Sequence, residues 1–215
     1  LLWIRNEVVK AAREGTEDGD EKSLRVAALE PKERAEKADR LLVVFNQDLV
    51  GEDKIGQAVG WTPFLIEPSA KGNWIWNRKN AMEFELDEPL PKGNRFSVKA
   101  TDRFALKLGQ PLSGKNEFSL QSSPLRVERC VESGRKGDRI EVELRFNQEV
   151  EPAVLGESFE AVDSSGKVLV KEVLSAGRRR VHAVMVELPT ERILEVSLKK
   201  GMPGVEGPLG LEKDF

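Results

Sequence analysis

Hydrophobic and polar residues alternate along much of this chain, most regularly between Trp74 and Thr101. The apolar members of three successive runs are spaced two residues apart: Trp74 and Trp76, then Met82, Phe84 and Leu86, then Phe96, Val98 and Ala100. A period of two places alternate side chains on opposite faces of a β-strand. Turn-forming residues 89–94 link the last two runs. The stretch therefore predicts three strands in the middle of a β-sandwich.

Runs of the same kind, separated by turn signals, occupy two segments of about 100 residues each, which is typical of sandwich domains. In the first segment the other expected strands are Leu24–Ala28, Leu41–Phe45, Phe64–Ile66 and Glu117–Gln121. Residues 104–113 are expected to form a long connection.

The second segment begins with an expected strand at Leu125–Val131. Its most regular strand is Arg139–Phe146, in which apolar and charged residues alternate strictly. Residues 159–163 and 167–174 flank a Ser-Ser-Gly turn and are predicted to pair as a hairpin. Residues 180–188 are apolar at almost every position, so both faces of this strand could be buried. A last strand is expected at 194–198.

The chain opens with a segment whose apolar residues approximate one helical face, so Leu1–Glu14 is predicted to be a helix. Together these patterns predict an all-β protein: two tandem antiparallel β-sandwiches after a short N-terminal helix. The expected segments are 1–22 for helix and linker, 23–122 for the first sandwich and 123–215 for the second.

A short internal repeat supports two domains. Phe45-Asn46-Gln47-Asp48 recurs as Phe146-Asn147-Gln148-Glu149, each time after an apolar strand. The interval between the two phenylalanines is 101 residues, the length of one sandwich.

Composition limits the classes of partner. The formal net charge of −3 provides no broad basic surface, so nucleic acid is not expected as a partner. No apolar run is long enough to span a membrane. The first residues, Leu-Leu-Trp-Ile, resemble the interior of a sequence. We therefore expect the chain to be part of a longer polypeptide, whose targeting signals lie elsewhere.

Few residues are suited to chemistry. Cys130 is the only cysteine and His182 the only histidine, and each lies within a strand pattern. A structural role is the simpler explanation for both. The alternatives are a reactive thiol and a catalytic imidazole, but no nucleophile motif or phosphate-binding loop accompanies them. We expect no catalytic residue, no cofactor and no metal site.

Two groups of residues are candidates for an interaction surface. Trp61, Trp74 and Trp76 could stack on sugars, although large aromatic residues more often belong to a core. Arg178, Arg179 and Arg180 follow Gly177 and are expected in a solvated hairpin turn. They could also form a patch for an acidic partner.

A family resemblance accompanies these patterns. The order of a strand ending in Phe-Asn-Gln-acid, then Trp-x-Trp, then Met82-Glu83-Phe84 and Pro89-Leu90-Pro91-Lys92-Gly93 resembles the amino-terminal macroglobulin-like domains of bacterial α2-macroglobulins. It is also similar to bacterial Ig-like domains of surface and S-layer proteins. The resemblance covers Leu41–Gln121 best. Phe96 departs from it, because such domains often carry tyrosine there.

The resemblance implies non-catalytic Ig-like sandwiches in a large periplasmic or cell-surface protease inhibitor. Expected partners are other domains of the same polypeptide and, through the parent protein, proteases. No thioester is implied here, because Cys130 is followed by Val131-Glu132-Ser133 rather than by Glu-Gln. Two alternatives stay open: an adhesion, S-layer or carbohydrate-binding module, and an accessory domain of a secreted hydrolase.

Overall fold

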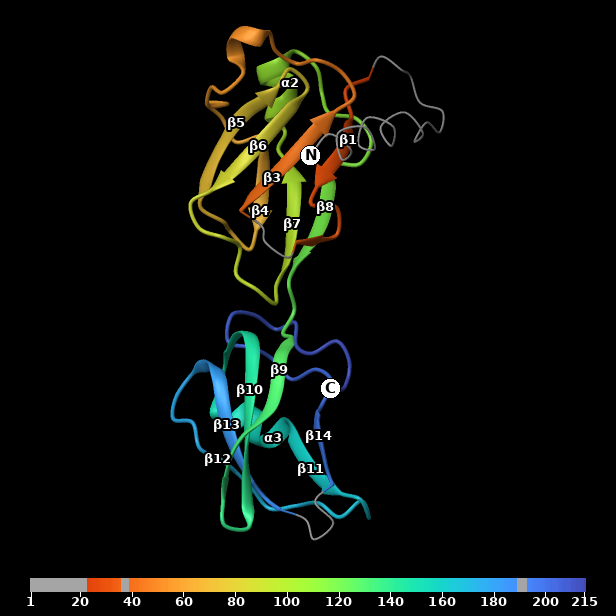
Figure 1. Cartoon of the computed structure of the whole chain (residues 1–215). Helices are drawn as coiled ribbons and strands as arrows, with labels where there is room; N and C mark the ends of the chain where they lie inside the picture. Colours follow the sequence, from red (N-terminus) through yellow and green to blue (C-terminus); the bar gives the residue numbers. More distant parts are fainter. Residues whose placement is uncertain (1–22, 36–38, 189–192) are drawn as a thin grey trace. The chain divides into compact units, whose positions relative to one another are not determined.

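The computed structural model describes residues 23–35, 39–188 and 193–215 (Figure 1). The described strands are Val26–Glu30 (β1), Arg34–Ala35 (β2), Arg40–Phe45 (β3), Phe64–Glu67 (β4), Gly72–Arg78 (β5), Ala81–Leu86 (β6), Arg95–Ala100 (β7), Glu117–Ser122 (β8), Val127–Lys136 (β9), Arg139–Val150 (β10), Phe159–Asp163 (β11), Lys171–Val173 (β12), Arg179–Glu187 (β13) and Leu194–Leu198 (β14). The described helices are Glu52–Lys54 (η1), Arg103–Leu108 (α2) and Pro152–Ser158 (α3). This content confirms the predicted all-β class. The helix and linker predicted within residues 1–22 lie outside the described residues.

The chain divides into two compact units, of which the first comprises residues up to Leu90 together with Arg95–Gln121. Two four-stranded antiparallel sheets build it, in the orders β1-β3-β6-β5 and β2-β8-β7-β4. The strands bury alternate residues, as a two-layer sandwich requires. Its largest fully buried side chains are Leu24, Leu41, Phe45, Phe64, Met82, Phe96, Phe104 and Leu120.

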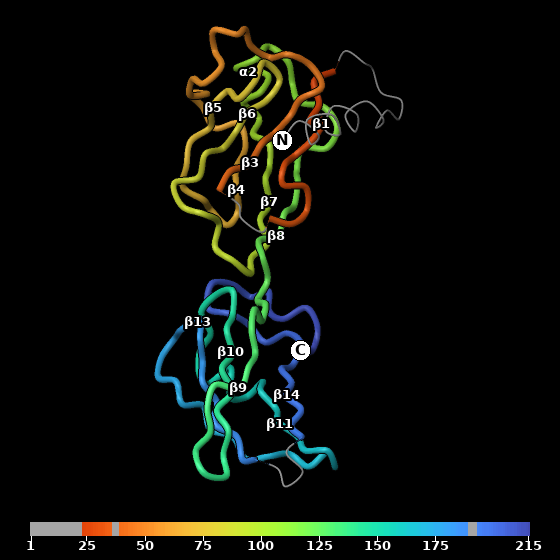
Figure 2. The backbone as a smooth tube through the Cα atoms, viewed as in Figure 1, coloured from red at the N-terminus to blue at the C-terminus, as the bar shows by residue number. Residues whose placement is uncertain are grey.

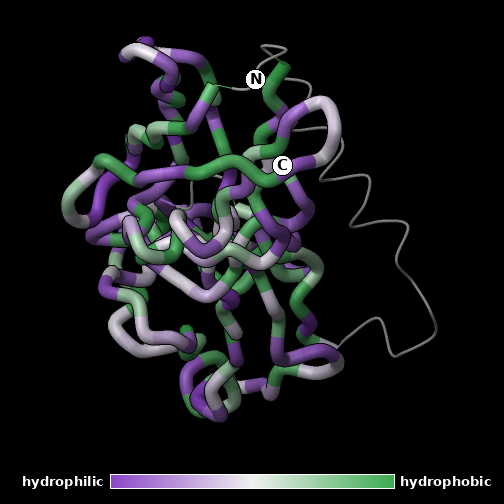
Figure 3. The backbone as a smooth tube through the Cα atoms, turned by 90° about the horizontal axis from the view of Figure 1, so that it is seen from below, coloured by the Kyte–Doolittle hydropathy of each residue, from purple (hydrophilic) through white to green (hydrophobic). Residues whose placement is uncertain are grey.

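The second unit comprises Pro91–Asn94 and Ser122–Phe215. It contains a four-stranded antiparallel sheet in the order β12-β13-β10-β9 and a two-stranded sheet of β11 and β14. Figure 2 traces the long hairpin formed by β9 and β10. The largest fully buried side chains of the second unit include Leu125, Leu144, Phe146 and Phe159. Figure 3 shows hydrophobic and hydrophilic stretches alternating along the backbone, as expected for strands with one buried face.

The two units share one topology. The order β1-β3-β6-β5 in the first unit matches β9-β10-β13-β12 in the second, strand for strand along the chain. The pair β4–β7 likewise matches β11–β14. The described part of the second unit has no strand that matches β8.

Two local predictions differ from the structure. The expected hairpin of residues 159–163 and 167–174 forms only next to its turn, through the bridge between Val162 and Val168 and the bond from the Leu169 N–H to the Ala161 carbonyl, because β12 pairs with β13 instead. The strand β13 buries alternate residues rather than both faces. The long connection expected over 104–113 begins within α2, a helix whose only buried residue is Phe104. Helix α3, which begins at Pro152, was not predicted.

Candidate functional site

The described residues contain no group of three or more His, Cys, Asp or Glu side chains placed to hold a metal ion. Cys130 lies on β9 opposite Leu144 and is half-buried. Burial raises the pKa of its thiol. The reactive form of cysteine is the thiolate, so this environment disfavours nucleophilic chemistry at Cys130. Among the described helices, none is long and apolar enough to cross a membrane.

His182 is a fully buried residue of β13. Its Nε2 atom lies 3.0 Å from the carbonyl oxygen of Val150 and 3.0 Å from that of Arg179. Both partners are acceptors, so Nε2 carries the proton, while the buried Nδ1 has no hydrogen-bond partner. Burial lowers the pKa of the imidazole, which the two carbonyl contacts offset only in part. The ring is therefore neutral at physiological pH and anchors the end of β10.

The structure corrects the interpretation of the tryptophans as a sugar-stacking platform. Trp74 and Trp76 are only 7% and 5% exposed, because both point from β5 into the core of the first unit. The ring centroid of Trp74 lies 5.4 Å from that of Phe64. Trp61 is half-buried and packs edge-on against Phe104, with centroids 5.1 Å apart. Trp74 and Trp76 therefore present no free ring face, as a platform needs.

All three arginines are exposed, as predicted, and they lie at the connection between the paired strands β12 and β13, although only Arg178 precedes the strand. Arg179 and Arg180 are the first residues of β13, and Arg178 precedes them. Arg178 donates to the carboxylate of Glu151, while an Nη atom of Arg180 lies 3.6 Å from a carboxylate oxygen of Glu128. Arg179 donates to a carbonyl of its own loop. Two of the three charges are thus already matched by carboxylates within the unit.

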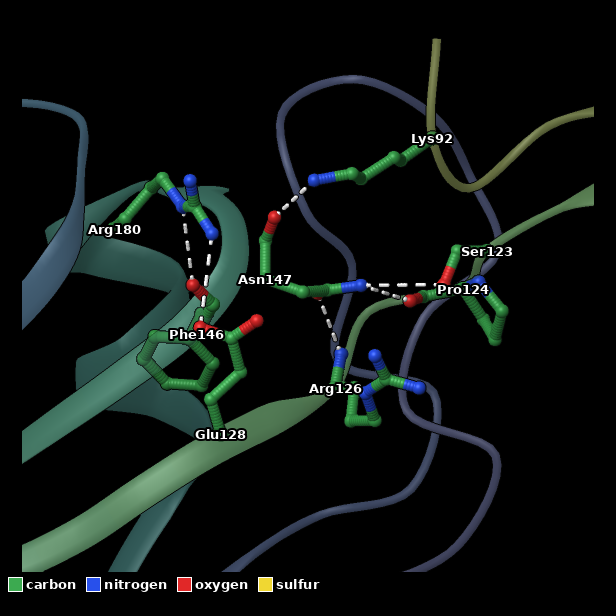
Figure 4. Close-up of polar contacts among 8 residues, drawn as sticks. All are labelled: Lys92, Ser123, Pro124, Arg126, Glu128, Phe146, Asn147 and Arg180. Carbon is green, nitrogen blue, oxygen red and sulfur yellow. Dashed lines mark hydrogen bonds and ion pairs between the residues drawn. The ribbon is translucent and has the colours of Figure 1, made fainter. Parts of the chain in front are cut away.

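The best-organised polar cluster surrounds Asn147, in a bulge of β10 where the pairing with β13 shifts between Arg145 and Val150 (Figure 4). The Asn147 side chain is 2% exposed. Its Oδ1 atom accepts a hydrogen bond from the Arg126 N–H at 2.9 Å, and its Nδ2 atom donates to the Pro124 carbonyl at 2.9 Å. The Asn147 N–H donates to the Arg126 carbonyl at 3.1 Å. One side chain thus secures the chain just before β9 begins.

Charged side chains donate hydrogen bonds to the carbonyl groups of the bulge. A bulge removes regular ladder partners, so its carbonyl groups need other donors. The Nε atom of Arg180 lies 3.3 Å from the Phe146 carbonyl oxygen, and the ammonium of Lys92 donates to the Asn147 carbonyl (Figure 4). Lys92 belongs to the same compact unit. The side-chain oxygen of Gln148 accepts from the Glu206 N–H at 3.3 Å.

The first unit contains the same arrangement around Asn46. Its Oδ1 atom accepts from the Arg25 N–H at 2.8 Å, its Nδ2 atom donates to the Ser23 carbonyl at 2.9 Å, and its N–H donates to the Arg25 carbonyl at 3.1 Å. We call this set of three bonds the asparagine clamp. The two clamps differ in environment, since Asn46 is exposed and Asn147 is buried.

Sequence reasoning found the repeated Phe-Asn-Gln motif but not what the asparagine binds. The signal was present, because Leu24-Arg25-Val26 recurs as Leu125-Arg126-Val127 with the same interval of 101 residues. The two repeated segments are the two sides of each clamp.

The first unit also carries a groove of about 1340 Å³ beside β1 and β8. Buried Leu29, Phe96 and Leu120 line its base, and its rim includes Glu33 and Arg95. The charges of this rim are of both signs, so the groove does not favour one class of charged ligand.

No model of a protein family matches this chain, and no curated protein matches it. Among solved structures, L,D-transpeptidase 3 from Mycobacterium tuberculosis is 12% identical, with 56% of this chain and 44% of that chain covered at a TM-score of 0.31. An L,D-transpeptidase from Mycobacterium smegmatis is 15% identical, with 77% and 76% covered at 0.33. The N-terminal part of the bacterial S-layer protein SbsC is 12% identical, with 81% and 40% covered at 0.29.

The chain spans 44% and 63% of the length of the first two transpeptidase chains that it matches. TM-scores this low carry no argument about fold or function. The following proposals therefore rest on the chain's own residues and on its sequence resemblance.

Proposed function

We propose that the chain provides two copies of one β-sandwich module with structural and interaction roles in a cell-surface or envelope protein, without catalysis of their own. The observation that carries this proposal is the repeated asparagine clamp within a repeated strand order. In both copies the side chain of one asparagine, Asn46 or Asn147, fixes the path of the backbone. Repetition of such anchoring contacts is what a scaffold of tandem modules requires.

The location can be tested with an epitope inserted at Gly137, in the turn between β9 and β10. That glycine has a φ of 63°, and no other atom lies within 4 Å of where a Cβ would stand, so an insertion there disturbs little packing. We expect antibody to label intact cells that express the full parent protein. A matched epitope on a cytoplasmic protein of the same cells must be labelled only after permeabilisation. Labelling of Gly137 only after permeabilisation would contradict the surface location.

The absence of catalysis can be tested on the purified chain. We expect no turnover of peptide, ester or glycoside substrates. Cys130→Ser and His182→Gln serve as controls, since these residues carry the only thiol and the only imidazole. An activity that both variants retain belongs to other residues. Reproducible turnover that follows the protein through purification would overturn the proposal.

A finer proposal concerns the parent protein. The sequence resemblance across Leu41–Gln121 supports an α2-macroglobulin-like protease inhibitor, in which proteases are partners of the parent and not of these modules alone. We expect the purified parent to protect large protein substrates from an endopeptidase while small peptide substrates are still cleaved. A parent that leaves both cleavages unaffected would favour adhesion, an S-layer or an accessory domain of a hydrolase instead.

A further inference from the structure

Two exposed arginines face each other on the outer surface of the four-stranded sheet of the second unit. Strand β10 buries Leu144 and Phe146, so the side chain of Arg145 between them points away from the core. Arg129 of β9 is the residue directly opposite Arg145 in the ladder, so both side chains lie on the same face. Such residues hold their Cβ atoms about 5 Å apart, and like charges in this position repel each other.

A third arginine extends this basic pair onto the neighbouring strand. Val181 of β13 lies opposite Arg145 on the other side of β10. Arg179 precedes Val181 by two residues on the same strand, so its side chain lies on the same face, where it is exposed. We call Arg129, Arg145 and Arg179 the arginine patch.

The charges of the arginine patch are not matched within the described part of the chain. The flanking residues Arg178 and Arg180 are each paired with a glutamate, whereas no ion pair between described residues includes a member of the patch. Arg179 donates to the Ala176 carbonyl, which carries no net charge to offset that of the guanidinium. Glu143 lies on the same face of β10 and is likewise in no ion pair between described residues.

The surroundings of the patch favour a protein as its partner. Val131 and Val181 lie on the same face and are only half-buried, so apolar contact area borders the three charges. Guanidinium groups bind carboxylates through paired hydrogen bonds, and arginine is enriched in protein interfaces. Three cations in a chain with a net charge of −3 are too few to attract a nucleic acid. An extended peptide places alternate side chains about 7 Å apart on one side, a spacing that long arginine side chains can meet.

We infer that the arginine patch docks an extended protein segment that carries carboxylates at alternate positions. One carboxylate lies between Arg129 and Arg145 and offsets their repulsion, and a second binds Arg179. This inference rests on the interaction role proposed above, to which it assigns a surface and the chemistry of a partner.

Titration of the purified chain with a short acidic peptide tests the inference. The probe is Gly-Glu-Ser-Glu-Ser-Glu-Gly, and the control peptide carries glutamine in place of each glutamate. Binding is followed by NMR through the amide signals of Val131 and Val181 at low ionic strength. Arg129→Glu reverses one charge of the patch, whereas Arg103→Glu makes the same change of charge at an exposed position of α2 in the first unit.

We expect saturable shifts with the acidic peptide and none with the control peptide. The affinity should be lower by about fivefold or more for Arg129→Glu and unchanged for Arg103→Glu. Equal losses in the two variants would overturn the inference, because net charge rather than the patch would then decide binding. Shifts caused by heparin but not by the acidic peptide would also overturn it, in favour of an anionic glycan.

Thermal unfolding of the second unit, followed by the NMR signals of β10, provides an independent readout. Arg129→Glu places a carboxylate opposite Arg145, so the Tm should be unchanged or higher. A lower Tm would show that Arg129 already has partners within the unit and would overturn the inference. Absence of peptide binding would overturn this inference alone, because the surface location and the absence of catalysis have tests of their own.

Discussion

Replacing Asn147 with alanine should destabilise the second unit more than the equivalent change destabilises the first. Asn147→Ala removes the bonds at 2.9 Å to the Arg126 N–H and the Pro124 carbonyl, and both bonds are part-buried. A polar group left without a partner costs about 1–1.5 kcal/mol under such conditions, so the expected loss is about 2–3 kcal/mol. In a unit of about 100 residues, this loss corresponds to a decrease in Tm of about 10–15 °C.

Asn46→Ala is the matched control, because its bonds of 2.8 and 2.9 Å have the same geometry in an exposed setting. Water can replace them there, so the expected loss is about 1 kcal/mol or less. Every tryptophan of the chain lies at or before Trp76. Tryptophan fluorescence in a urea titration therefore reports the first unit, whereas hydrogen exchange of β10 reports the second.

Three results would refute this reasoning. Equal losses at the two positions would show that burial does not decide the strength of the clamp. A loss below about 0.5 kcal/mol for Asn147→Ala would show that the clamp contributes little, whatever its geometry. If Asn46→Ala changed hydrogen exchange in β10 more than Asn147→Ala does, the assignment of each clamp to its own unit would also be contradicted.

Three further predictions concern buried residues. Because burial depresses the pKa of His182 below the ordinary 6.5, the unfolded state takes up the proton first, so the free energy of unfolding of the second unit should fall as the pH drops below 6.5. Urea titrations at about pH 7.5 and about pH 5.5 measure this, and His182→Gln should reduce the difference. The Cys130 thiol, with its raised pKa, should react with iodoacetamide more slowly in the folded protein than in urea, and equal rates would contradict its burial. Trp74→Ala should cost about 3–5 kcal/mol in urea unfolding of the first unit, and a small loss would contradict its place in the core.

Many of the strands could be located from sequence because they bury alternate residues. Arg139–Phe146 was predicted from strict alternation, yet β10 continues to Val150. The prediction stopped early because Asn147 and Gln148 are polar, and polar residues normally mark the end of a buried strand. Their burial depends on partners elsewhere in the unit, which local periodicity does not reveal.

Pairing between strands was harder to predict than the strands themselves. A Ser-Ser-Gly turn favoured a hairpin, and Gly166 does adopt the expected positive φ of 82°. The chain nevertheless leaves β11 after Leu169, and the following residues pair with β13 instead. Short helices such as α2 escape prediction for another reason, since six residues with one buried side chain show no helical period.

The candidate surface could not be resolved from sequence, because tryptophans two residues apart fit both a core strand and an exposed platform. Only the opposite sheet decides between them, and here it supplies Phe64 against Trp74. The asparagine clamp was within reach, since both of its segments repeat at one interval. The repeat alone does not show which backbone groups the asparagine side chain binds.

Each clamp joins residues only 21 positions apart, which bears on how two similar sandwiches in one chain avoid exchanging strands. Neighbouring domains of like topology tend to misassemble during folding, because the first strand of one can occupy its place in the other. An asparagine that captured the wrong partner would have to close a loop several times longer. The additional entropy cost is about 1–1.5 kcal/mol. The short clamp thus favours correct assembly of each copy while the chain is still emerging from the ribosome.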